Sequence, residues 1–137
     1  METEIADILD ANAMIAYLRD ESGADVIEWV LLDKNIRVFA HSINLCEVYY
    51  DTIRFSNEVA AEKAVKNLSD LGVIERTDFD QAFWKQVARF KANYKASLAD
   101  LCGIVLANKL NGSFLTTDHH ELDKVAADGI CKIQFIR

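Results

Sequence analysis

Short apolar runs that alternate with longer helical stretches constrain the fold of this chain more than any other feature. The runs are rich in β-branched residues and lie at Ile5–Leu9, Ile36–Ala40, Gly72–Glu75, Ser113–Thr116 and Cys131–Phe135. Strands that alternate with helices form parallel sheets with helices on both faces, joined by right-handed crossovers. The sequence therefore predicts one α/β domain over residues 1–137. Its architecture should be a three-layer α/β/α sandwich around a mostly parallel sheet of four to five strands.

Several features argue against a membrane or secreted protein. No apolar run reaches the roughly 18 residues that a membrane-spanning helix needs. The N-terminal Met-Glu-Thr-Glu lacks the basic start of a secretory signal. The three cysteines show no C-x-x-C spacing, which predicts reduced thiols rather than a disulfide framework or a zinc site. We therefore expect a cytoplasmic protein with no membrane partner.

The formal charge of −7 disfavours a polyanionic substrate, but the acidity is local. Residues 1–33 carry nine acids and one base, which leaves 14 bases and 13 acids in the remainder. One predicted helix region holds four bases and no acid: Lys85, Arg89, Lys91 and Lys95. These bases are the candidate RNA-binding residues, and an ordinary solvated helix face explains them equally well.

Four acids follow predicted strands or open predicted helices. Asp10 comes directly after the first strand, and Glu47 lies about one turn into the helix after the second. Asp100 opens a long apolar helix, and Asp118 ends the fourth strand-like run. Because ligands of open parallel sheets bind beyond the carboxyl ends of the strands, we expect these carboxylates to share one edge of the sheet.

Converging carboxylates are the ligands that hard divalent cations prefer. Such ions can activate water on one side of a phosphodiester and stabilise the leaving oxygen on the other. Without metal, the acids should repel one another and hold protons more tightly. Helix capping offers an alternative for each acid, because Asn44-Leu-Cys-Glu47, Ser97-Leu-Ala-Asp100, Asp118 with Glu121, and Asp10 all fit N-terminal capping patterns.

Four short motifs in this order resemble the PIN domain family, and within it the VapC-type toxins of bacterial toxin–antitoxin modules. The motifs are Leu9-Asp10-x-Asn12, Glu47-Val-Tyr-Tyr, Leu98-Ala99-Asp100 and Leu115-Thr116-Thr117-Asp118. Each motif alone is weak, but together they span nearly the whole chain. The resemblance implies the PIN-like three-layer α/β/α fold.

The resemblance implies an endoribonuclease that depends on Mg²⁺ or Mn²⁺. In that family Asp10, Glu47, Asp100 and Asp118 would coordinate metal, with Asn12 and Thr116 as supporting polar groups. Related toxins cut tRNA or ribosomal RNA and usually form homodimers. They are silenced by an antitoxin whose tail wraps the toxin and reaches its acidic site.

Two other functions compete with this one. A catalytically silent PIN-like module that only binds a protein partner would also keep the fold. A receiver-like phosphoryl-transfer domain would gather acids and Mg²⁺ at strand ends, although it needs two adjacent acids after the first strand, where Asp10-Ala-Asn12 offers one. Cleavage of RNA that requires magnesium would separate the nuclease from both.

Two further groups of residues invite a functional interpretation. His119 and His120 flank Asp118, but adjacent residues on a helix point in different directions, so we expect surface or capping positions for both. Aromatic side chains can stack on unpaired bases, although most here have core-like spacing. The candidates are Trp29, Tyr49, Tyr50, Trp84 and Phe90.

Overall fold

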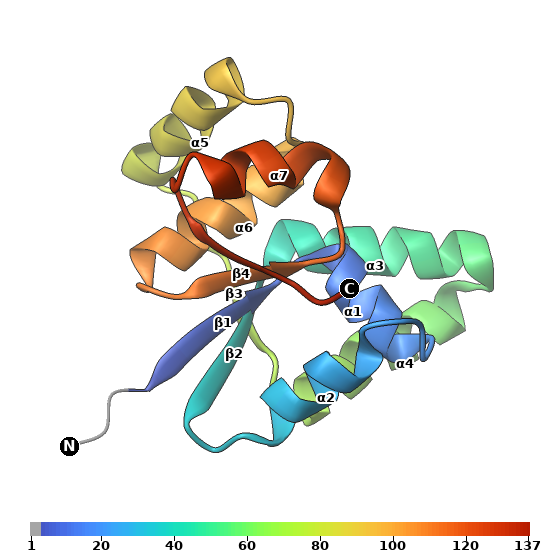
Figure 1. Ribbon diagram of the computed structural model, residues 1–137. Coiled ribbons are helices and arrows are strands. Elements are labelled where there is room, and N and C mark those ends of the chain that lie inside the picture. The colour runs from blue at the N-terminus through green and yellow to red at the C-terminus, as the bar shows by residue number, and fades with distance from the viewer. Residues whose placement is uncertain (1–3) are drawn as a thin grey trace.

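The computed structural model describes residues 4–137 and shows five strands in one sheet (Figure 1). The strands are β1 (Ile5–Leu9), β2 (Ile36–His41), β3 (Ile74–Arg76), β4 (Ser113–Thr116) and β5 (Lys132–Phe135). Their order across the sheet is β3-β2-β1-β4-β5, and every pairing is parallel. The predicted parallel α/β architecture is confirmed. Residues 1–3, whose acidic composition disfavours a secretory signal, lie outside the described residues.

Seven helices connect the strands within residues 4–137. They are α1 (Ala11–Leu18), α2 (Ala24–Leu32), α3 (Ser42–Phe55), α4 (Glu58–Asp70), α5 (Gln81–Asn93), α6 (Leu98–Lys109) and α7 (His119–Ala127). Helices α1 to α4 lie on one side of the sheet and α5 to α7 on the other (Figure 1). No helix in this part of the chain is long and apolar enough to cross a membrane.

The side chains of adjacent strand residues pack into two separate hydrophobic cores. Ile8 and Phe114 pack against α5, α6 and α7, whereas their neighbours Leu9 and Leu115 pack against α1, α2 and α4. Side chains of a strand alternate between the two faces, so a sheet covered on both faces needs continuous apolar strands. This burial explains why the sequence shows short apolar runs rather than alternating ones.

The third strand differs from its predicted bounds. The sequence predicts Gly72–Glu75, but β3 covers Ile74–Arg76. Gly72 has a φ of +104°, and its backbone N–H donates to the carbonyl of Ser69, so it closes the turn after α4. A left-handed backbone cannot continue a strand, and glycine adopts it without steric cost.

Candidate metal centre

Asp10 stands at the centre of the candidate site. It is fully buried directly after β1, where its Oδ1 accepts the backbone N–H of Ala13 at 2.6 Å and caps α1. Its Oδ2 accepts a hydrogen bond from the Thr116 hydroxyl at 2.5 Å. Burial raises the pKa of Asp10 to about 7, with the hydrogen bonds opposing and the charges of Asp100 and Glu47 adding to the rise. Asp10 is therefore both a helix cap and a member of a carboxylate cluster.

Thr116 links the carboxyl ends of the neighbouring strands β1 and β4. Besides donating to Asp10, its Oγ1 accepts the backbone N–H of Asp118 at 3.0 Å. Asp118 in turn caps α7 by accepting the N–H of Glu121 at 3.3 Å. The predicted capping role of Asp118 is confirmed, and Thr116 holds it beside the end of β1.

Asp100 approaches the same edge of the sheet from the first turn of α6. Ser97 caps this helix by accepting the N–H of Asp100 at 3.1 Å, as the sequence predicts. Burial raises the pKa of Asp100 to about 6, the Ser97 hydrogen bond opposes the rise, and the charges of Glu47, Asp118 and Glu121 add to it. The acids are therefore close enough to repel one another.

Glu47 reaches the cluster from the second turn of α3. Burial raises its pKa, while the side chains of Asn44 and Tyr50 lower it by stabilising the ionised form. The prediction that Asn44 caps this helix is wrong. Asn44 lies inside α3, fully buried, and its Nδ2 donates to the carbonyl of Ala99 at 3.3 Å. Asn44 thus ties α3 to the start of α6, and its buried Oδ1 has no partner among the described residues.

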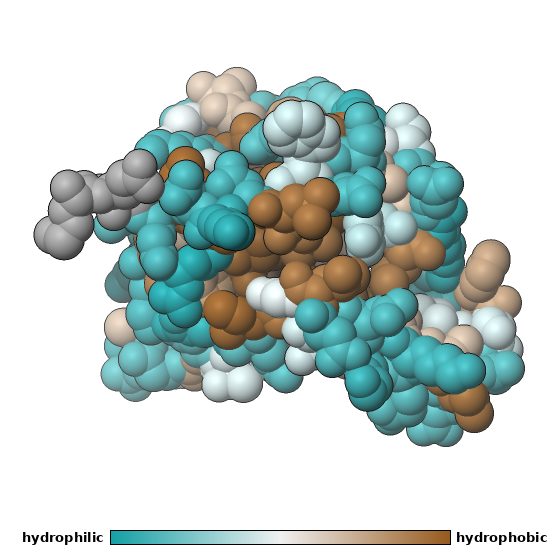
Figure 2. Space-filling view, turned by 90° about the horizontal axis from the view of Figure 1, so that it is seen from below, coloured by the Kyte–Doolittle hydropathy of each residue, from teal (hydrophilic) through white to brown (hydrophobic). Residues whose placement is uncertain are grey.

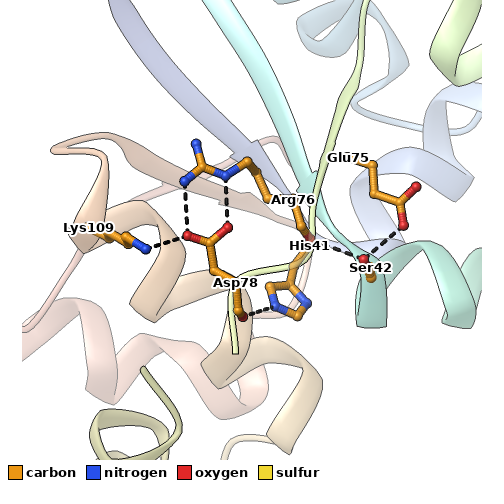
Figure 3. Close-up of polar contacts among 6 residues, drawn as sticks. All are labelled: His41, Ser42, Glu75, Arg76, Asp78 and Lys109. Atoms are coloured by element: carbon orange, nitrogen blue, oxygen red, sulfur yellow. Dashed lines mark hydrogen bonds and ion pairs between the residues drawn. The ribbon is translucent and has the colours of Figure 1, made fainter. Parts of the chain in front are cut away.

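His41 is the actual cap of α3, and a polar network holds it in place (Figure 3). Its Nδ1 accepts the N–H of Ile43 at 3.1 Å, so the proton lies on Nε2, which donates to the carbonyl of Asp78 at 2.8 Å. The Asp78 carboxylate accepts two hydrogen bonds from Arg76 and one from Lys109. These contacts hold the pKa of Asp78 well below its usual range. The network fixes the β2–α3 junction and hence the direction in which α3 carries Glu47.

Glu121 is a site residue that the sequence-based interpretation missed. Asp100, Asp118 and Glu121 each offer a carboxylate oxygen, and these oxygens lie within 4.8 Å of one another. The sequence pattern predicts for Glu121 only a capping position in the helix that Asp118 opens. The i, i+3 spacing from Asp118 was the available signal, because residues three apart lie on one face of a helix.

The donor set fits a hard divalent cation. Carboxylates converge from the start of α1, from α3, from α6 and from α7, and oxygen is the ligand that Mg²⁺ and Mn²⁺ prefer. Burial, with a smaller contribution from the neighbouring negative charges, raises the pKa of Asp10 to about 7 and that of Asp100 to about 6. The unpartnered Oδ1 of Asn44 adds a buried acceptor next to Glu47.

The predicted RNA-binding bases do not form one helical stripe. Lys85 and Arg89 are exposed on α5, but Lys91 donates to the carbonyl of Ala96. Lys95 lies beyond the end of the helix, so the prediction of one helix carrying all four bases is wrong. Ala96 is fully buried against the core, which turns the chain away from the helix axis before α6 begins.

The remaining polar candidates lie outside the cluster or at its border. Asn12 is exposed in the first turn of α1. The ring of His119 stacks on Phe135 at 4.0 Å between centroids, and its Nε2 contacts the carbonyl of Arg137 at 2.8 Å. His120 is exposed. Both histidines therefore occupy surface positions, as the sequence predicts.

The fold and the site together define a class of protein: a parallel α/β sandwich that gathers carboxylates at the carboxyl edge of its sheet. The PIN domain profile matches residues 8–128. The chain therefore belongs to the PIN domain family, which also sets aside the receiver-like alternative. No curated protein sequence matches the chain.

Solved structures share this fold along nearly the whole chain. VapBC2 from Rickettsia felis, bound to a promoter DNA fragment, has a TM-score of 0.72 at 16% identity and covers 96% of this chain and 98% of its own. A toxin–antitoxin complex from Klebsiella pneumoniae has a TM-score of 0.73 at 14% identity, with coverage of 96% and 98%. VapC20 from Mycobacterium tuberculosis, a sarcin–ricin loop cleaving toxin, has a TM-score of 0.69 at 15% identity, with coverage of 90% and 95%. Identities this low establish likeness of fold.

Proposed function

We propose that this PIN domain is a Mg²⁺- or Mn²⁺-dependent endoribonuclease and the cytoplasmic toxin of a toxin–antitoxin pair. The observation that carries the proposal is the convergence of Asp10, Glu47, Asp100 and Asp118, with Glu121 beside them, at one edge of the sheet. Capping explains why Asp10 and Asp118 stand at the starts of α1 and α7. Capping does not require that acids from other helices lie close enough to raise the pKa values of Asp10 and Asp100.

The residues of the site would have two roles, binding the metal ion and orienting the carboxylates that bind it. Asp10, Glu47, Asp100 and Asp118 would hold the metal, and Thr116 would orient Asp10 through its hydroxyl. When bound, the cation would supply Lewis acidity toward phosphate and water. Because metal binding requires ionised carboxylates, the protons held by Asp10 and Asp100 must leave first.

The proposed partners follow from the similar structures and from the surface. Toxin–antitoxin complexes share this fold, so we propose an antitoxin, a homodimer and a tRNA or ribosomal RNA substrate. Figure 2 shows hydrophobic side chains gathered in the middle of one face and surrounded by hydrophilic ones. On α2, Trp29 is 79% and Leu32 is 74% exposed, and both line a pocket with Glu28 and Asp33. The exposed apolar and acidic side chains of α2 suit a partner segment that combines apolar and basic residues.

Cleavage of total RNA by the purified protein tests the proposal. Wild-type protein and an Asp10→Asn variant are compared with EDTA, Mg²⁺ or Mn²⁺, and circular dichroism checks that both are folded. We expect cleavage only with metal and only by the wild type. A folded wild type that neither cleaves RNA nor binds metal by calorimetry would instead be a silent PIN-like binding module.

A further inference from the structure

One face of α3 leads outward from the acid cluster. Glu47, Tyr50 and Arg54 are spaced i, i+3 and i+7, which places them on the same side of the helix. The helical rise sets Arg54 about 10 Å beyond Glu47 along the helix axis. Tyr50 stabilises the ionised Glu47, and the Arg54 guanidinium lies 4.9 Å from the centroid of the Tyr50 ring. An acid of the candidate metal centre, an aromatic ring and a cation thus form a continuous series.

The positive charge of Arg54 remains available to an external anion. Among residues 4–137, no carboxylate forms an ion pair with Arg54. The nearby Asp51 is bound by Arg19 at 2.6 Å. Arg54 itself is exposed, and Tyr50 keeps 42% of its surface exposed although the guanidinium lies over its ring.

The other acids close to this part of the chain are also engaged. The Tyr49 hydroxyl donates to Glu62 at 2.9 Å and contacts Glu58 at 3.2 Å. These two carboxylates lie on α4, so they are held on the α4 side of α3. Arg54 therefore presents a positive charge at the surface of a chain whose formal charge is −7.

We infer that the Tyr50–Arg54 face of α3 binds the single-stranded RNA segment next to the cleaved bond, with a base on Tyr50 and a phosphate on Arg54. This inference rests on the proposed nuclease function. A cluster of acids repels phosphate, so the substrate needs cations beside the cluster, and nucleic-acid affinity comes largely from such contacts. Aromatic rings and guanidinium planes stack on unpaired bases. The predicted RNA-binding bases of the α5 region form no such series with the acid cluster, because Lys91 donates to the carbonyl of Ala96 and Lys95 lies beyond the end of α5.

Two substrates separate RNA binding from the chemistry. A single-stranded RNA oligomer needs the α3 face, whereas bis(p-nitrophenyl) phosphate needs only the metal centre; both are assayed with Mn²⁺. The variants are Arg54→Gln, Tyr50→Leu and Tyr50→Phe. The matched control is Arg37→Gln, which removes an exposed charge on β2.

We expect Arg54→Gln and Tyr50→Leu to lower kcat/KM for the oligomer between about five-fold and one hundred-fold. Hydrolysis of the small diester should stay unchanged in Arg54→Gln. In Tyr50→Leu it should fall no further than in Tyr50→Phe, because both variants lose the hydroxyl that hydrogen-bonds to Glu47. Arg54→Gln should also reduce the slope of log affinity against log salt by about 0.7, as loss of one single-strand phosphate contact requires. Tyr50→Phe keeps the ring and should bind the oligomer as the wild type does, and Arg37→Gln should behave as wild type in every assay.

Three results would overturn the inference in distinguishable ways. Unchanged oligomer cleavage and an unchanged salt slope in Arg54→Gln and Tyr50→Leu would remove the α3 face from RNA binding and leave the nuclease standing. Equal loss of both substrates would show that Tyr50 and Arg54 only position Glu47. A wild type that binds no Mn²⁺ and cleaves neither substrate would refute the nuclease itself, and the inference with it.

Discussion

Asp10→Asn should make the metal-free protein more stable at high pH although it removes a residue of the candidate site. The asparagine Oδ1 can still accept the N–H of Ala13, and its amide can donate to the Thr116 hydroxyl, so the hydrogen bonds survive. The buried negative charge disappears. The variant therefore isolates the energetic cost of ionising Asp10 in the folded protein.

The raised pKa sets the size and the pH range of the effect. The pKa of Asp10 is about 7 in the fold against an ordinary 3.8. Because the folded value is the higher one, the native state keeps a proton that the unfolded chain releases, so stability falls as pH rises between these values. Each unit of difference between the folded and unfolded pKa values lowers the free energy of unfolding by about 1.4 kcal/mol, which amounts to about 4 kcal/mol above pH 7. We expect Asp10→Asn to gain up to that amount at pH 8.5 and little below pH 4.

Urea unfolding in EDTA, measured between pH 4 and pH 8.5, checks this expectation. Asp80→Asn is the matched control, since Asp80 also caps a helix by accepting an i+3 N–H, at 2.9 Å, but is exposed. Mn²⁺ should stabilise the wild type at high pH and leave Asp10→Asn nearly unaffected. An Asp10→Asn variant no more stable than the wild type at pH 8.5, or equally more stable at pH 4, would refute the reasoning.

Other substitutions test the support of the site. Asp78→Asn should lower the free energy of unfolding in urea by about 2 to 3 kcal/mol at pH 7, because it breaks charge-assisted hydrogen bonds to two basic side chains. This loss of stability should shrink as the pH falls through 3.8 and below, where the wild-type carboxylate itself becomes protonated. Gly103→Ala should cost about 1 to 3 kcal/mol in the same assay, since its methyl group would overlap the ring of Phe114 in the core; wild-type stability would contradict that packing. Thr116→Val keeps the side-chain shape but removes the donor to Asp10, so calorimetry should show about ten-fold weaker Mn²⁺ binding, and unchanged affinity would deny Thr116 an orienting role.

Most of the fold was predictable because its signals are local. Short, mostly apolar runs marked β1 and β4 at their observed bounds, since a strand covered by helices on both faces needs no strict polar alternation. Capping side chains marked the start of α6 and α7. Errors arose where one residue type serves two backbone states, as at Gly72, whose positive φ puts it in a turn rather than in β3.

The candidate site was predictable only in part. Strand ends and capping patterns pointed to the four acids, but they assigned Glu121 to capping alone and Asn44 to a cap that His41 provides. Histidine is a less common cap than asparagine, so the local pattern favoured the wrong residue. No sequence signal indicated that Arg54 has no ion-pair partner among residues 4–137, because that depends on which acids its neighbours in space engage.

The sequence by itself determined the class of fold and the presence of carboxylates at strand ends, because hydrophobic period and capping act over a few residues. Only the tertiary structure decided how these acids affect one another. The hydrogen bond from Thr116 to Asp10 joins residues 106 positions apart, and the buried environment that raises the pKa of Asp10 comes from several packed elements. Electrostatic coupling depends on distance and desolvation, which local sequence patterns do not encode.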